Sequence, residues 1–136
     1  MSFNGTLLKV GSTAIPYKFM STESYKVTPN QRMESSAKRV STGLLHRTTC
    51  SHTASKIEFN TPALWNRDAE ELMNLLENAW TNVNQRKCYV TYFDPETNTH
   101  KSGTFYMPDI DFTIMKVDLI HNRILYAPIR ICFIEY

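Results

Sequence analysis

One stretch of the chain repeats its apolar residues at helical spacing, and it lies between long segments whose residues favour strands. The repeat advances by four, three, four and three residues through Trp65, Ala69, Leu72, Leu76 and Ala79. That spacing places the five side chains on one face of a helix. Thr61 is a candidate N-cap, and Pro62 suits a first helical turn. We therefore predict a single helix over residues 62–80 whose apolar face packs on a sheet.

Most of the remaining segments are rich in β-branched and aromatic residues, which are typical of strands. The predicted strands are residues 6–10, 55–59, 86–93, 102–107, 112–117 and 124–136. Residues 25–53 are predicted to form one long hairpin whose polar middle, residues 33–38, is flexible. One helix among such strands indicates an α+β fold, mainly an antiparallel β-sandwich with one flanking α-helix and a long β-hairpin.

Length and composition favour one globular domain over residues 1–136. The chain has 42% apolar and 21% charged residues, close to the globular average. Its three cysteines, Cys50, Cys88 and Cys132, form no C-x-x-C pair, as expected of a protein that folds in a reducing cytoplasm without disulfides. No apolar window approaches the roughly 18 residues of a membrane span, so we expect no membrane partner.

The charge is concentrated in one segment. Residues 25–48 carry five cations against Glu34 alone, a local net charge of +4 in a chain whose total is +2. The sequence pI of about 8.4 is low for a dedicated nucleic-acid binder. On a projecting hairpin, these cations could face a neighbouring subunit, face DNA passing through a pore, or stay solvated. We assign them as a candidate oligomer interface: Lys26, Arg32, Lys38, Arg39 and Arg47.

Residues for catalysis or metal binding are not grouped in any recognisable pattern. His46 and His52 share a strand face but would lie about 20 Å apart, too far to bind one ion. Asp94, Asp109 and Asp111 each lie beside a proline or a strand break, where aspartate usually forms turns. The sequence therefore predicts a protein that is not an enzyme and needs neither cofactor nor metal.

Several short motifs together resemble a family of small, uncharacterised siphophage tail-cluster proteins, which are encoded beside the tape-measure gene. The more specific motifs lie in the second half of the chain, after the helix. The matching segments are Leu8–Gly11 with Ile15-Pro16, Ala37–Arg39, Gly43–Arg47, Lys56–Glu58, Asp94–Thr97, and Lys101–Tyr106 followed by Asp109.

The resemblance implies a structural virion component similar to distal-tail and tail-tube proteins. Such proteins share a β-sandwich with one helix and a long hairpin, and they form hexameric rings. The implied partners are further copies of the chain and the tube, tape-measure and hub proteins, with transient contact to DNA in the lumen. The implied location is the virion tail, after assembly in the bacterial host cytoplasm. Two alternatives remain open: a tail-completion or connector protein, and a single-strand nucleic-acid-binding module.

Overall fold

The computed structural model describes the backbone of residues 3–39 and 43–136, and their side chains apart from residues 30, 32–39 and 45–53. The fold class predicted from the sequence is confirmed: the described chain is α+β, mainly antiparallel sheet, with one α-helix. The elements, in chain order, are β1 (Leu8–Val10), β2 (Thr13–Ala14), η1 (Tyr17–Phe19), η2 (Thr22–Ser24), β3 (Lys26–Arg39), β4 (Leu45–Asn60), β5 (Leu64–Trp65), α1 (Asn66–Ala79), β6 (Trp80–Asn82), β7 (Lys87–Asp94), β8 (Thr99–Tyr106), β9 (Ile114–Asp118), β10 (Arg123–Tyr126) and β11 (Arg130–Glu135).

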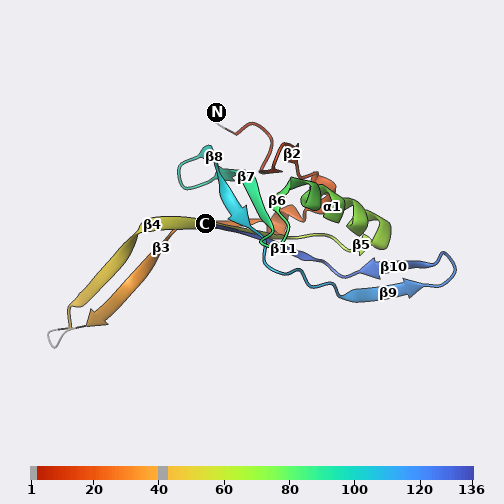
Figure 1. Cartoon of the computed structure of the whole chain (residues 1–136). Helices are drawn as coiled ribbons and strands as arrows, with labels where there is room; N and C mark the ends of the chain where they lie inside the picture. Colours follow the sequence, from red (N-terminus) through yellow and green to blue (C-terminus); the bar gives the residue numbers. More distant parts are fainter. Residues whose placement is uncertain (1–2, 40–42) are drawn as a thin grey trace.

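The strands form two sheets, and each sheet sends one hairpin away from the body. The larger sheet has the order β2-β1-β7-β8-β11-β4-β3, with β6 paired beside β7, and the smaller has the order β5-β10-β9. Figure 1 shows the β3–β4 hairpin leaving the body on one side and the β9–β10 hairpin leaving it on the opposite side. The molecule is thus a central body with two arms.

The core lies between the larger sheet and α1. Alternate residues of the strands point inward, as Ile57 and Phe59 do from β4 and Val90 does from β7. The helix contributes the apolar face predicted from its spacing, and Leu72 and Leu76 are almost completely buried. The predicted packing is therefore confirmed for Ala69, Leu72 and Leu76, whereas Trp65 lies in β5 before the helix and is only half-buried.

The helix begins four residues later than predicted, at Asn66. Thr61 does not cap it, because its Oγ1 accepts the backbone N–H of Ile129 (3.0 Å) and donates to the carbonyl of Pro62 (2.8 Å). The next residues, Leu64–Trp65, pair with β10 as a short strand. Sheet pairing therefore overrides the favourable cap and proline signals at the predicted start.

Two strand predictions are also corrected. Residues 33–38, predicted to be flexible, belong to β3 and pair with β4. The pairing has three register irregularities, and the first, between Thr28 and Gln31, accommodates Pro29 and its missing N–H. The predicted final strand over residues 124–136 is two strands in different sheets, separated by Ala127–Ile129. Pro128 lies in this gap between the two strands. Its lack of a backbone N–H therefore removes no hydrogen bond from either sheet.

We expect the thermal midpoint of unfolding to be the same with and without a reductant or EDTA. Cys88 and Cys132 are free and buried, and burial raises the pKa of the Cys88 thiol to about 11, so this thiol stays protonated and unreactive. The side chain of Cys50 lies outside the described set. Differential scanning fluorimetry with each reagent checks the prediction, and a fall of several degrees would contradict it.

Candidate assembly surfaces

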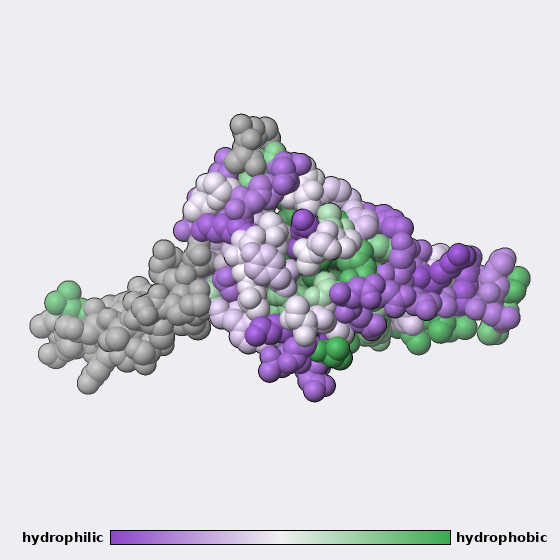
Figure 2. Space-filling view, turned by 45° about the horizontal axis from the view of Figure 1, so that its top comes forward, coloured by the Kyte–Doolittle hydropathy of each residue, from purple (hydrophilic) through white to green (hydrophobic). Residues whose placement is uncertain are grey.

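The β9–β10 hairpin and the residues leading into it, 112–126, form an arm with an apolar surface. Leu119 and Ile120 at its tip are 80% and 88% exposed. Figure 2 shows hydrophobic surface along the lower edge and at the tip of this arm, on the right of the view. Six large apolar side chains are exposed here: Phe112, Ile114, Met115, Val117, Leu119 and Ile120. Exposed apolar residues gathered in this way mark an interaction surface. We call residues 112–126 the apolar arm.

A bulge in β9 brings apolar residues to one face of this arm. Val117 lies opposite Ile124, but Ile114 rather than Met115 lies opposite Tyr126. Directly opposed residues share a face, and so do alternate residues of β10. Ile114 and Val117 therefore lie on the same face as Ile124 and Tyr126.

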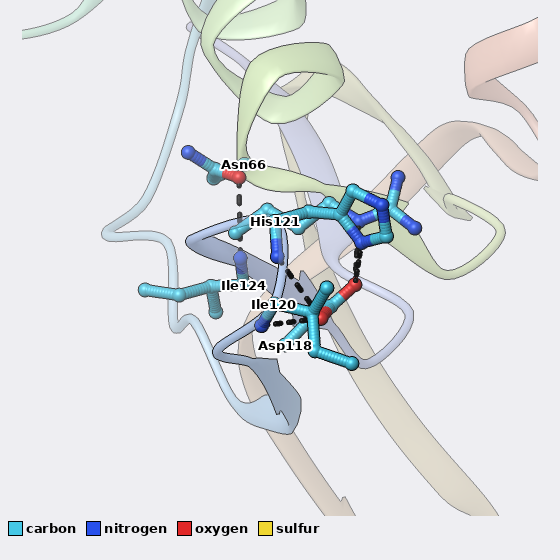
Figure 3. Close-up of polar contacts among 6 residues, drawn as sticks. Asn66, Asp118, Ile120, His121 and Ile124 are labelled. Atoms are coloured by element: carbon cyan, nitrogen blue, oxygen red, sulfur yellow. Dashed lines mark hydrogen bonds and ion pairs between the residues drawn. The ribbon is translucent and has the colours of Figure 1, made fainter.

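Asp118 fixes the turn at the tip of the apolar arm. Its Oδ1 accepts the backbone N–H groups of Ile120 (3.1 Å) and His121 (3.3 Å), and its Oδ2 accepts the Nε–H of Arg123 (3.0 Å). His121 Nδ1 lies 2.9 Å from the same Oδ2 (Figure 3). The hydrogen bond from His121, followed by that from Arg123, lowers the pKa of Asp118. The turn is therefore held by a carboxylate that stays ionised, with Leu119 and Ile120 facing solvent.

Two further contacts tie the apolar arm to the start of α1. The Asn66 Oδ1 accepts the backbone N–H of Ile124 (3.2 Å; Figure 3). The guanidinium of Arg123 lies 3.7 Å from the centre of the Trp65 ring, a cation–π contact. The tip of the arm is therefore held both by its own turn and by contacts to the start of the helix.

The helix beside the apolar arm is acidic on its exposed side. Glu70, Glu71 and Glu77 are exposed, and Asp68 is half-buried in the first turn. Residues 66–79 carry these four anions against Arg67, a net charge of −3, whereas the apolar arm carries Lys116 and Arg123 against Asp118, a net charge of +1. The helix and the apolar arm together therefore carry a net charge of −2, opposite in sign to that of residues 25–48.

The five cations predicted as an oligomer interface come from one hairpin. We call this β3–β4 hairpin the basic arm. Lys26, at its base, has an exposed side chain whose Nζ lies 3.9 Å from Oε1 of Glu58. Glu58 binds Arg130 more closely (2.6 Å), and that hydrogen bond lowers the pKa of Glu58. The remaining predicted residues lie on β3 and β4, but their side chains lie outside the described set: Arg32, Lys38, Arg39 and Arg47.

The sequence-based assignment included the basic arm and missed the apolar one. Residues 112–117 were predicted only as a strand, and apolar strand residues usually face a core. A usable signal was present between the predicted strands 112–117 and 124–136, where Leu119 and Ile120 follow Asp118 directly. Two large aliphatic residues beside a tight turn have no core within reach, so they point to a surface contact.

The residues considered for chemistry have structural contacts. Asp94 forms a turn, as predicted, because its Oδ1 accepts the backbone N–H of Glu96 (2.9 Å). Asp109 is exposed and lies 3.8 Å from Arg86. The side chains of His46 and His52 lie outside the described set. Among the side chains that are described, no three histidine, cysteine or acidic residues gather in a way that could hold a metal ion.

Within the described part of the chain, no helix combines the length and the apolarity needed to cross a membrane.

Comparison with known families gives one match. The model of a family of unknown function (DUF6711) matches residues 1–136. Neither the curated proteins nor the solved structures include a match to the chain.

Proposed function

We propose that this chain, which belongs to DUF6711, a family of unknown function, is a structural subunit of a bacteriophage or prophage tail. In this proposal the subunit assembles into a ring at the distal tail or baseplate hub. Its work is mechanical: it holds its neighbours in place and performs no catalysis.

The observation that carries the proposal is the pair of arms on opposite sides of one small body (Figure 1). One end has a net charge of +4, and the other has −2, with acidic residues of α1 beside an exposed apolar surface. Two different, complementary ends favour head-to-tail contact between copies, which closes into a ring when the rotation between neighbours permits. A dimer that joined two like ends would instead bring like charges together.

The place of the phage-like motif in the fold also supports a structural role. Lys101 binds the buried carboxylate of Asp94 (3.0 Å) across the β7–β8 hairpin. Phe105 is fully buried in the core, and a Cβ at Gly103 would crowd the carboxylate of Glu135. The signature residues therefore build a hairpin and its packing, as residues of a structural family are expected to do.

We expect the double variant Lys38→Glu/Arg39→Glu to block ring formation and to leave the monomer folded. The change converts two cations of the basic arm to anions, so the interface would carry like charges on both sides. Size-exclusion chromatography with light scattering and electron microscopy would follow the rings, and circular dichroism would follow the fold.

A control variant with the same change in net charge is Lys9→Glu/Lys18→Glu. Both lysines are exposed on the body, and the ion pair of Lys18 with Glu71 is largely solvated, so its loss costs little. The control should assemble as the wild type does. Normal rings from the Lys38/Arg39 variant, or normal virions in a complementation assay, would show that the basic arm is not the interface. Steeply salt-dependent binding of single-stranded DNA by a monomer would favour the nucleic-acid-binding alternative instead.

A further inference from the structure

We propose that the apolar arm docks on the basic arm of a second copy of this chain, so that each ring contact joins the two arms. This inference rests on the ring assembly proposed above and adds the surface that receives the basic arm. It assigns Leu119 and Ile120 as the apolar anchors of the contact.

The first support is the fixed shape of the apolar arm. Asp118 holds the turn through its contacts to Ile120, His121 and Arg123, and Asn66 holds the start of β10 through Ile124. The apolar residues are therefore held outside the core by specific polar contacts (Figure 3). A surface that is already ordered loses little conformational entropy on binding, which favours affinity.

The second support is charge, and it selects the occupant. The apolar arm lies beside α1, whose exposed Glu70 lines the same hollow as Phe112 and Tyr126. Two apolar arms packed against each other would bring two acidic ends together, at a cost from like charges. The basic arm carries the opposite net charge, and each copy of the chain supplies one. A head-to-tail contact between copies therefore brings opposite charges together.

The third support is the position of both hairpins at sheet edges. β9 ends the order of the smaller sheet, and β3 ends that of the larger one. An end strand offers backbone donors and acceptors along its outer side, and a strand of another chain can pair there. Pro29 lacks a backbone N–H, so pairing along β3 is favoured between Gln31 and Arg39. That part of β3 holds three of the basic arm's cations.

A mixing experiment with two assembly-defective variants tests this contact. Leu119→Ser/Ile120→Ser removes the apolar anchors, and Lys38→Glu/Arg39→Glu disables the basic arm. Both replaced apolar side chains are at least 80% exposed, so the fold and thermal midpoint of the monomer should not change. We expect the serine variant to self-associate about 100-fold more weakly than the wild type, because two anchors lose their apolar burial.

Mixing the two variants should give a one-to-one heterodimer and nothing larger. The Lys38→Glu/Arg39→Glu variant (the Glu variant) keeps its apolar arm, and the Leu119→Ser/Ile120→Ser variant (the Ser variant) keeps its basic arm, so these two arms can bind. The other arm of each variant is defective and cannot add a further copy. Native mass spectrometry identifies the pair, because the two variants differ in mass. Val83→Ser/Tyr89→Ser is the control: it removes two exposed apolar side chains outside the arm, of which Val83 is 70% and Tyr89 53% exposed, and should leave rings intact.

The outcomes separate this inference from the proposed function. Rings of normal size from the Ser variant would overturn the inference and leave the ring proposal standing. A mixture of folded, defective variants that forms no heterodimer would also overturn it, because the arms then do not meet. A wild type that stays monomeric at its highest soluble concentration would instead overturn the ring proposal, and the arm contact with it.

Discussion

Replacing Leu76 by alanine is expected to lower the free energy of unfolding by about 2–5 kcal/mol. The Leu76 side chain is fully buried at the centre of the face that α1 packs on the larger sheet. Removing it loses apolar burial and leaves a cavity that the neighbouring strands can fill only in part. Urea denaturation followed by circular dichroism at neutral pH measures the change.

Glu77→Ala is the matched control for this substitution. Glu77 is the next residue of the helix, but its side chain is exposed, so its replacement should change stability by no more than about 0.5 kcal/mol. If Leu76→Ala cost as little as Glu77→Ala, the apolar face of the helix would be assigned to the wrong side.

The helix illustrates how much of the fold could be predicted from sequence. Its buried face followed directly from the spacing of Leu72 and Leu76, because periodicity reflects burial. Its start did not, although Thr61 and Pro62 are good local signals. Those signals describe an isolated helix, whereas Thr61 is engaged by Ile129, which is 68 residues away in sequence. Non-local pairing of this kind is not visible in local propensity.

For the candidate assembly surfaces too, local sequence features could be predicted and features that depend on the tertiary fold could not. The basic arm could be predicted because five cations and a long hairpin are both properties of one continuous segment. The exposed face of β9 in the apolar arm could not, because Ile114 and Val117 are residue types of ordinary buried strands. Their exposure depends on where β9 lies in the smaller sheet, an edge that faces away from the body. Sequence spacing gives the strand, and only the topology shows that one side is uncovered.

Replacing Asp94 by alanine is expected to lower the free energy of unfolding by about 3 kcal/mol. The substitution removes a buried carboxylate and leaves the hydrogen-bond donors around it without an acceptor. The side chain of Asp94 is fully buried at the β7–β8 turn. It accepts hydrogen bonds from the backbone N–H of Glu96 (2.9 Å) and from Thr97 Oγ1 (3.2 Å), and it pairs with Lys101 Nζ (3.0 Å). Asp109→Ala, at an exposed aspartate, is the control and should have little effect.

The contribution of Asp94 should also depend on pH with a definite sign. Burial alone would raise the pKa of this carboxyl, but the hydrogen bonds from Lys101 and the Glu96 backbone outweigh it, so the pKa in the folded state is lowered. The unfolded chain therefore takes up the proton first, at a pKa of about 3.9. The stability that the charged Asp94 supplies is complete above that pH and is lost as the pH falls through the lower folded pKa. Asp94→Asn keeps the size of the side chain and removes the titration.

The difference in unfolding free energy between the wild type and Asp94→Asn should therefore narrow as the pH falls from 7 to about 3. Other acidic groups with lowered pKa values, such as Glu58 and Asp118, are present in both proteins and cancel in the difference. Guanidinium chloride titrations at several pH values measure this difference. A difference that stayed constant with pH would mean that Asp94 stabilises the turn through hydrogen bonds to a neutral side chain, and that its charge contributes nothing.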